Sequence, residues 1–289
     1  MKKQSLLHSG AMGRRLGQHF LENATWRGRV IESLHITAAD SWIEIGAGRG
    51  EMTAELARRA ARVLAIEKDP PLAHHLRRLA AATPNLKLLQ ADILKVDLAA
   101  LIGEAQQALP ATCVFVYGSL PYYITSPILH RLFPHAAGLA AIFVIIQREV
   151  AERLVARPGT RDYGYLSVAT QFYTQPDILF TIPPGAFRPP PRVTSSLVSL
   201  RAPGAGAQLG VTDAREFLGF AQACFAQKRK KLLNNLQALV PRAQALAWLA
   251  AAGAPPAARA EQLTLGQLAA IWQAAATSEA TYRARRSGD

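Results

Sequence analysis

Five short, largely apolar runs in the first half of the chain constrain its fold more than any other feature. They lie at residues 42–45, 63–66, 86–89, 113–117 and 140–146. Near-continuous rather than alternating apolar runs are typical of parallel strands that are covered on both faces. The pattern therefore predicts an α/β fold, in which helices connect the strands of one sheet by right-handed crossovers.

Local signals place helices and further strands around these runs. Residues 51–60 have the spacing of a helix with Leu56 facing inward, and Pro70 begins another helix, because proline suits a first turn. Residues 169–180 and 193–200 are β-rich with no long helix between them, which predicts a closing antiparallel pair. The expected sheet is mixed and seven-stranded.

A segment rich in alanine, proline and glycine at residues 202–207 interrupts the chain. A length of 289 residues allows two domains, each with its own core. We expect a first domain at residues 1–205, which includes a basic N-terminal segment, and a second at residues 206–289. The second is rich in alanine and leucine, so it is predicted to be small and all-helical.

The charge balance points to a polyanionic partner. Lys and Arg number 33 against 20 Asp and Glu, a net charge of +13 that favours nucleic acid. Thr212 or Asp213 can cap a helix whose apolar spacing continues to Leu236. On that helix Lys228 falls inside the apolar stripe, whereas Lys230 points away from it. The candidate RNA-binding side chains are Arg14, Arg15, Arg192, Lys228, Arg229, Lys230 and Lys231.

Several classes of protein are disfavoured. The two cysteines, Cys113 and Cys224, lie in different halves of the chain and suit neither a disulfide framework nor a metal site. The longest apolar stretch, residues 139–146, is far short of the ~20 residues that span a bilayer. No signal peptide is visible at the N-terminus. We therefore expect a cytoplasmic protein with reduced thiols, no membrane segment and no metal.

A glycine-rich loop, Glu44-Ile-Gly46-Ala-Gly48-Arg-Gly50, ends the first apolar run and opens a helix. Dinucleotide sites use G-x-G-x-x-G, with the pyrophosphate on the helix N-terminus. Here Gly50 comes one residue early and Glu51 would repel a pyrophosphate, so an NAD enzyme is disfavoured. The loop resembles the E-x-G-x-G-x-G loop of S-adenosylmethionine-dependent methyltransferases. A purely structural glycine turn is the alternative.

Two acidic residues follow the next two runs. Glu67 closes the second run, where a carboxylate can accept hydrogen bonds from both hydroxyls of a ribose. That geometry serves NAD and S-adenosylmethionine equally. Asp92 follows the third run and can accept from the exocyclic amine of an adenine, although a turn or cap residue would look the same. Parallel strands end at one edge of a sheet, so these groups are expected to meet there.

The fourth run leads into Ser119-Leu120-Pro121-Tyr122, which resembles the N-L-P-Y motif of methyltransferases that modify an exocyclic amino group of a base. The resemblance implies that Pro121 fixes a turn and that Tyr122 stacks on the base. It also implies that a backbone carbonyl and a side-chain oxygen accept from the amine. Serine replaces the asparagine of the motif at Ser119, and a serine oxygen sits on a shorter arm.

The resemblance covers nearly the whole chain, and its family is that of the small-subunit ribosomal RNA adenine N6,N6-dimethyltransferases (KsgA/RsmA type). Further segments similar to that family's motifs are residues 16–21, 163–168, 187–195, 225–230 and 234–236. Membership would imply a Rossmann-like, S-adenosylmethionine-dependent fold. It would also imply dimethylation of N6 of two adjacent adenosines in the 3′-terminal hairpin loop of 16S rRNA during small-subunit assembly.

Carried over by position, the resemblance assigns roles to individual residues. The implied cofactor-binding residues are His19, Leu21, Gly46, Gly48, Glu67, Asp92 and Ser119. The implied catalytic residues are Ser119, Leu120, Pro121, Tyr122 and Phe187, with Phe187 facing the target adenine opposite Tyr122. The partner would be 16S rRNA in the small subunit or its precursor, and nothing demands more than a monomer.

Two alternatives stay open. An rRNA-binding assembly factor of the same fold would have lost or reduced catalysis because of Ser119. A 23S rRNA methyltransferase of the resistance type would share the first domain. The segment at residues 225–236 resembles the small-subunit enzymes more closely.

Overall fold

The computed structural model describes residues 18–108, 113–227 and 230–277 of the chain. These residues fall into two compact units. One unit contains Met1–Ala151 and Pro176–Ala202, and the other contains Glu152–Gln175 and Pro203–Asp289. The second unit therefore includes a stretch that precedes the composition break at residues 202–207.

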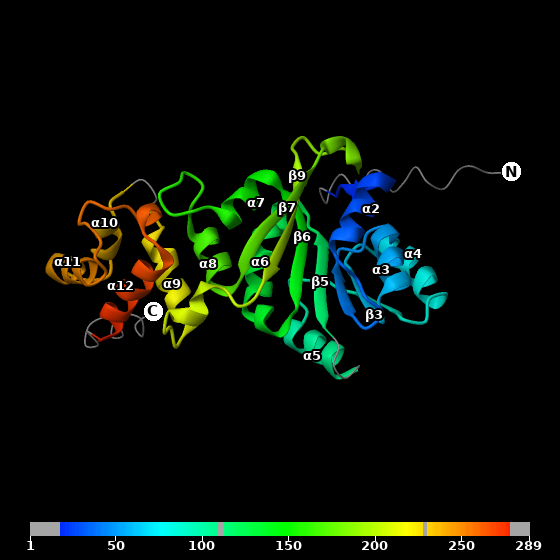
Figure 1. Ribbon diagram of the computed structural model, residues 1–289, viewed down its shortest axis with the longest axis horizontal. Helices are drawn as coiled ribbons and strands as arrows, with labels where there is room; N and C mark the ends of the chain where they lie inside the picture. The colour runs from blue at the N-terminus through cyan, green and yellow to red at the C-terminus, as the bar shows by residue number, and fades with distance from the viewer. Residues whose placement is uncertain (1–17, 109–112, 228–229, 278–289) are drawn as a thin grey trace. The chain divides into compact units, whose positions relative to one another are not determined.

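A seven-stranded sheet forms the centre of the first unit, with the strand order β4-β3-β2-β5-β6-β9-β7 (Figure 1). The strands are β2 (Ser41–Ile45), β3 (Arg62–Glu67), β4 (Leu86–Gln90), β5 (Val114–Ser119), β6 (Ala141–Gln147), β7 (Gln175–Ile182) and β9 (Ser195–Arg201). The pairs among β2 to β6 are parallel, and β9 runs antiparallel to β6. The predicted mixed, seven-stranded α/β sheet is confirmed.

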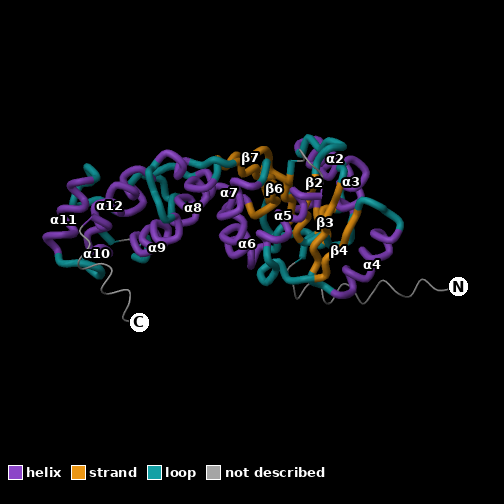
Figure 2. The backbone as a smooth tube through the Cα atoms, turned by 90° about the horizontal axis from the view of Figure 1, so that it is seen from below, coloured by secondary structure: helices purple, strands orange, loops and turns teal. Residues whose placement is uncertain are grey.

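Helices flank the strands of this sheet (Figure 2). They are α2 (Ala24–Ser33), α3 (Glu51–Arg59), α4 (Pro70–Ala81), α5 (Leu98–Ala108), α6 (Thr125–Leu132) and α7 (Arg148–Val155). Leu56 of α3 is fully buried, as its spacing predicted. Within the core, the ring of Trp42 stacks on that of Phe115 with centroids 4.7 Å apart. The apolar runs are thus strands covered by helices, which fixes the edge where their carboxyl ends meet.

A separate two-stranded sheet joins distant parts of the first unit. Strand β1 (Phe20–Leu21) pairs antiparallel with β8 (Phe187–Arg188), and Leu21 lies opposite Phe187. The backbone N–H of Asn23 also donates to the carbonyl of Ala186 at 3.1 Å. This pairing brings the segment after residue 17 against the segment that follows β7.

Within its described residues, the second unit is built from helices. They are α8 (Tyr165–Tyr173), α9 (Ala214–Cys224), α10 (Leu232–Leu236), α11 (Arg242–Ala251) and α12 (Leu265–Thr277). The Asp213 carboxylate caps α9 by accepting from the Glu216 N–H at 2.9 Å, as predicted. Phe217 of α9 packs against Phe172, with ring centroids 5.2 Å apart, and against Trp272. The all-helical prediction for the residues after the break is confirmed.

Two element predictions are wrong. Residues 169–173 belong to helix α8, not to a strand, and β7 begins only at Gln175. The predicted continuous helix to Leu236 stops at Cys224. The side-chain amide of Asn235 donates to the Cys224 carbonyl at 2.6 Å and so satisfies an acceptor at the end of α9. The stripe proposed for Lys228 assumed the unbroken helix, and Lys228 itself lies outside the described residues.

No helix in the described ranges is long and apolar enough to cross a membrane.

Candidate active site

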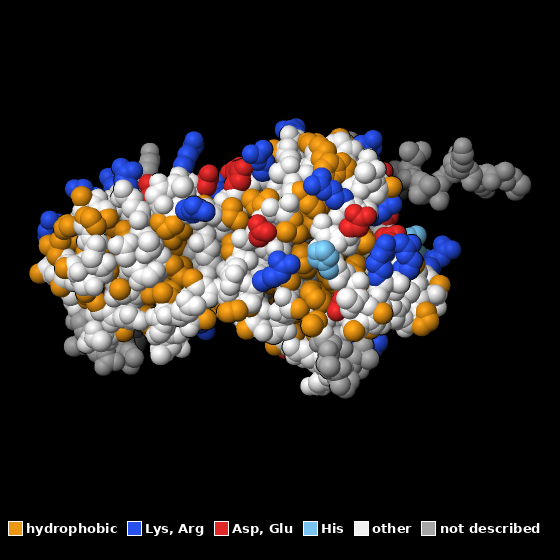
Figure 3. Space-filling view, viewed as in Figure 1, with side chains coloured by type: hydrophobic (Ala, Val, Ile, Leu, Met, Phe, Trp, Pro, Cys, Tyr) orange, Lys and Arg blue, Asp and Glu red, His pale blue; other side chains and the backbone are white. Residues whose placement is uncertain are grey.

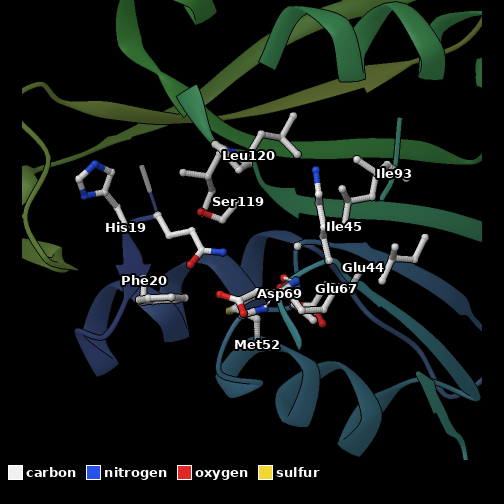
Figure 4. A pocket seen from close by; sticks show the side chains of 18 of the residues that line it. His19, Phe20, Glu44, Ile45, Met52, Glu67, Asp69, Ile93, Ser119 and Leu120 are labelled. Atoms are coloured by element: carbon white, nitrogen blue, oxygen red, sulfur yellow. Dashed lines mark hydrogen bonds between the residues drawn. The ribbon is translucent and has the colours of Figure 1, made fainter. Parts of the chain in front are cut away.

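A cavity opens where the parallel strands β2, β3, β4 and β5 end, on the edge predicted from the sequence (Figure 4). The β1–β8 pair contributes another part of its lining. All eleven residues assigned to cofactor binding or catalysis line it: His19, Leu21, Gly46, Gly48, Glu67, Asp92, Ser119, Leu120, Pro121, Tyr122 and Phe187. The structure therefore brings together every residue of these two predicted sets.

The glycine loop between β2 and α3 adopts a conformation that other residues rarely reach. Gly46, Gly48 and Gly50 have φ angles of +74°, +60° and +86°. A Cβ atom at Gly48 would also lie 3.0 Å from the ring of Phe20. Backbone in this left-handed region favours glycine, so the loop can pass close under a ligand without side chains in the way.

Glu67, at the end of β3, is held by the backbone. The Gly48 N–H donates to its Oε2 at 2.8 Å, and the Asp69 N–H donates to its Oε1 at 2.8 Å. Its carboxyl group is nearly buried, and Figure 4 shows it beside Asp69, with Ser119 and Leu120 across the cavity. Each carboxylate oxygen keeps a second lone pair, so Glu67 can still accept from the two hydroxyls of a diol.

Asp92 follows β4 and is oriented by two donors. Its Oδ1 accepts from the Leu94 N–H, and its Oδ2 accepts from Lys68 Nζ, both at 2.9 Å. The Lys68 hydrogen bond holds the pKa of the Asp92 carboxyl below its usual value. Asp92 is thus a turn residue and, at the same time, an ionised acceptor on the cavity wall.

The floor of the cavity contains buried polar atoms without a partner. Glu44 on β2 and Tyr117 on β5 lie opposite each other in register, and neither Glu44 Oε2 nor Tyr117 Oη has a hydrogen-bond partner among the described residues. The same holds for Asp69 Oδ1 and Gln18 Oε1. Burial raises the pKa of Glu44 to about 8. Unpartnered buried polar atoms are costly, so they point to a ligand that forms hydrogen bonds with them.

The turn after β5 presents its residues rigidly. The Pro121 carbonyl accepts from the Ile124 N–H and from Thr125 Oγ1, each at 3.1 Å. Tyr122 Oη is hydrogen-bonded to Ser195 Oγ at 2.8 Å, and the Tyr122 ring lies 5.4 Å from that of His19. Burial raises the pKa of Tyr122. The Tyr122 ring is therefore fixed at its hydroxyl end, with its phenol protonated at neutral pH.

The model of the family of ribosomal RNA adenine dimethylases matches residues 11–277. The chain belongs to this family. Membership confirms the expected Rossmann-like fold, methyltransferase activity directed at rRNA, and S-adenosylmethionine as the cofactor.

Relatives and solved structures agree with this membership. The "Ribosomal RNA small subunit methyltransferase A" of Acidobacterium capsulatum is 43% identical over 266 residues, 92% of each chain. That of Koribacter versatilis is 40% identical over 89% of this chain and 92% of its own. A dimethyladenosine transferase from Plasmodium falciparum has the same fold, with a TM-score of 0.74 and 21% identity over 91% of this chain and all of that chain. The 23S rRNA methyltransferase ErmE has a TM-score of 0.64 and 25% identity over 88% and 98%.

The cavity of this dimethylase suits its cofactor better than it suits a dinucleotide. Five acidic residues line it, namely Glu44, Glu51, Glu67, Asp69 and Asp92, against the two basic residues Arg49 and Lys68. Burial keeps Glu44 largely protonated at pH 7, so the negative charge comes from the other four carboxyl groups, and ionised acids repel phosphates and attract cations. S-adenosylmethionine carries a sulfonium, an ammonium, one carboxylate, a ribose diol and an adenine amine, so it has two positive charges against one negative charge and no phosphate. The donor groups of the cofactor thus match the surplus of acceptors.

Three of the predicted RNA-binding side chains belong to the described residues. Arg192 is exposed between β8 and β9, and Lys230 and Lys231 are exposed between α9 and α10. None of these three lines the cavity. The remaining candidates, Arg14, Arg15, Lys228 and Arg229, lie outside the described residues.

The lining residues to which sequence reasoning gave no site role include Gln18, Lys68, Asp69 and Ser195. Gln18 and Ser195 fall inside segments that carry the family resemblance, but the resemblance gave neither residue a role. Lys68 and Asp69 directly follow Glu67. Their place at the carboxyl end of a parallel strand, where ligands bind, is the sequence signal that could have identified them.

Proposed function

We propose that this chain dimethylates N6 of two adjacent adenosines in the 3′-terminal hairpin loop of 16S rRNA during assembly of the small ribosomal subunit. The observation that carries the proposal is that one cavity joins the acceptors Glu67 and Asp92 to the turn Leu120–Tyr122. A nucleoside-containing cofactor and a nucleobase can therefore meet in it. The names of the relatives at 43% and 40% identity support the small subunit as the source of the RNA.

The acceptors for the target amine follow from the hydrogen bonds of the turn. The Pro121 carbonyl is already used twice, whereas no described residue donates to the Leu120 carbonyl or to the Ser119 side chain. These two oxygens are therefore free to accept from an exocyclic amine. The lone pair of an aryl amine is delocalised into its ring, so accepting its hydrogens as the nitrogen turns makes it a better nucleophile.

The rings of Tyr122 and Phe187 would hold the target base. Tyr122 is anchored through Ser195, and Phe187 is fixed in β8 opposite Leu21. A base that is removed from its stack is held by aromatic side chains in an enclosed pocket. When bound, S-adenosylmethionine supplies the electrophilic methyl group. In the proposal, Glu67 holds its ribose, Asp92 its adenine, and His19, Leu21, Gly46 and Gly48 the remainder.

Binding of the RNA would be shared among basic side chains outside the cavity. Arg192, Lys230 and Lys231 are exposed, and we propose that they contact phosphates. We also propose that the helical second domain is the RNA-binding domain. Such contacts strengthen binding without selecting a sequence. We propose that the protein works as a monomer.

The test is methyl transfer from labelled S-adenosylmethionine to unmethylated small ribosomal subunits, with the nucleosides identified by mass spectrometry. The wild-type protein and Ser119→Asn are both expected to form N6,N6-dimethyladenosine. The asparagine variant is expected to be only modestly faster, because its side-chain oxygen replaces the Ser119 hydroxyl as an acceptor and does not add another one. Tyr122→Ala serves as the control that binds cofactor but transfers no methyl group.

Product from Ser119→Asn alone would favour the assembly factor with suppressed catalysis. Large-subunit RNA is assayed in parallel, and product on that RNA alone would favour the 23S alternative.

A further inference from the structure

Two large hydrophobic side chains stand out as exposed in the described part of the chain. Tyr123 is 60% exposed and Val193 is 44% exposed. Each lies on a segment that also carries an aromatic lining residue of the cavity: Tyr123 follows Tyr122, and Val193 comes after Phe187. Isolated exposed apolar residues are ordinary, but Tyr123 also lines the active-site cavity, so its exposed ring stands at the mouth, whereas Val193 is not part of the lining.

The segment that carries Tyr123 is tied to strand β9. The hydrogen bond between Tyr122 Oη and Ser195 Oγ joins the turn that holds Tyr123 to strand β9, which begins at Ser195. Tyr123 belongs to the 3-10 turn η1 (Tyr122–Ile124), which is closed by the Ile124 N–H on the Pro121 carbonyl. Its ring is consequently displayed by a rigid backbone. The two consecutive tyrosines thus differ in exposure: Tyr122 is half-buried in the cavity, whereas Tyr123 lines the cavity and is largely exposed.

We propose that the Tyr123 ring binds, by stacking, the nucleobase adjacent in the RNA to the one that enters the cavity. This inference rests on the proposed function in taking RNA as the substrate. When one base leaves the stack of a loop, its neighbour loses a stacking surface of its own. An exposed ring at the mouth replaces that surface, and every base has a π-face that can use it. The partner is therefore an unpaired, single-stranded stretch rather than a duplex.

Variants at one position separate the properties of this side chain. Tyr123→Phe keeps the ring and removes the hydroxyl, Tyr123→Leu keeps apolar bulk without a ring, and Tyr123→Ala removes both. Each variant is assayed for the KM of small ribosomal subunits, for methyl transfer at saturation, and for the affinity of S-adenosylmethionine. A hairpin RNA with 2-aminopurine beside the target adenosine supplies a direct signal, because an aromatic neighbour quenches this fluorophore.

The expected result is a KM for subunits that rises roughly 10- to 100-fold in Tyr123→Ala, the range that one stacked base supplies. Tyr123→Leu should resemble Tyr123→Ala, and Tyr123→Phe should resemble the wild type. Quenching of 2-aminopurine on binding should follow the same order, while cofactor affinity stays unchanged in all three.

Other outcomes overturn the inference. An unchanged KM and unchanged quenching in Tyr123→Ala would show that no base stacks on the ring. Weaker cofactor binding in Tyr123→Ala would mean that the ring covers the cofactor instead. Failure of the wild-type protein to transfer methyl groups counts against the proposed function and not against stacking, because the fluorescence of the bound hairpin is read without catalysis.

Discussion

Glu44 is a carboxyl group that the folded protein holds without a full set of partners. It is buried on β2, with Tyr117 opposite it on β5, and burial raises its pKa to about 8. At pH 7 the group is therefore mostly protonated in the folded protein. The unfolded chain ionises the same carboxyl near its ordinary value of 4.5. This residue should therefore make the stability of the first unit depend on pH between its unfolded and folded pKa values.

The sign follows from linkage. Below pH 4.5 both states carry the proton, and between pH 4.5 and 8 only the unfolded state releases it, so stability falls as the pH rises through that window. Glu44→Gln removes the titration. The free energy of unfolding of the variant minus that of the wild type should increase between pH 4.5 and pH 7. We expect the increase to be on the order of 2–3 kcal/mol.

Urea unfolding at several pH values without cofactor measures this difference. Tyr117→Phe is the matched control, since it removes the neighbouring unpartnered hydroxyl, which does not titrate in this range. Its effect should be the same at each pH. A wild-type stability that does not fall relative to Glu44→Gln as the pH rises would contradict the assignment.

Among the elements of the second unit, helix α8 meets the turn η4 (Ala205–Gln208) at a point where no side chain fits. The Gly204 N–H donates to the Tyr173 carbonyl at 2.9 Å. A Cβ atom on Gly204 would lie 2.4 Å from the Thr174 N and 2.6 Å from the Phe172 carbonyl oxygen. These neighbours are backbone atoms and cannot rotate away. The junction therefore depends on the absence of a side chain, although the φ of Gly204 is ordinary at −85°.

Gly204→Ala is expected to lower the free energy of unfolding of the second unit by about 2–4 kcal/mol, the cost of forcing atoms into a packed contact. Gly28→Ala is the matched control. Gly28 lies inside α2, and a Cβ atom added there would have nothing within 4 Å, so alanine should stabilise that helix by about 0.5–1 kcal/mol. Thermal unfolding of both variants measures the contrast, and equal melting temperatures would refute it.

Elements were predictable from the sequence wherever one local pattern dominates. The five apolar runs became strands because a strand covered on both faces needs no polar alternation. Residues 169–173 were misjudged because Thr170, Phe172 and Tyr173 favour strands locally, whereas burial of Val168, Ala169 and Phe172 in the second unit selects the helix. The end of α9 at Cys224 could not be predicted because the helical spacing of apolar residues continues beyond it.

Some residues of the site were predictable from the sequence, and others were not. Glu67, Asp92 and the glycine loop are signalled by their place at strand ends, which the order of elements reveals. Ser195 reaches Tyr122 only through tertiary folding, across 73 positions of sequence. Periodicity carries no information about such a pair. The hydrogen bond from Lys68 to Asp92 is likewise a property of the folded chain.

At the scale of the whole molecule, the excess of positive charge should govern binding to RNA and leave cofactor binding alone. The net charge is +13, and Lys and Arg side chains are scattered over the face seen in Figure 3. The cavity, by contrast, is lined mainly by acids among its charged residues. Salt screens phosphate contacts and releases counterions, so the affinity for RNA should fall steeply with ionic strength.

The double substitution Lys230→Gln and Lys231→Gln is expected to reduce the slope of log affinity against log salt by about 1.5–2, if each lysine neutralises one phosphate. Binding of small ribosomal subunits at several salt concentrations measures the slope. Arg78→Gln with Lys87→Gln is the control, since it removes the same charge from exposed positions that are not among the candidate RNA-binding side chains. An equal reduction in both double variants would mean that only overall charge matters.

The pairing of β1 with β8 has a consequence for the order in which the protein is made. A nascent chain that has reached the end of β6, at Gln147, already holds Glu67, Asp92 and the turn at Tyr122. It lacks Phe187, the partner of Leu21, so strand β1 has no strand to pair with and one wall of the cavity is missing. Closing that wall joins residues far apart in sequence, a late event in folding. The growing chain thus acquires the groups that recognise the cofactor before it acquires the wall that encloses it.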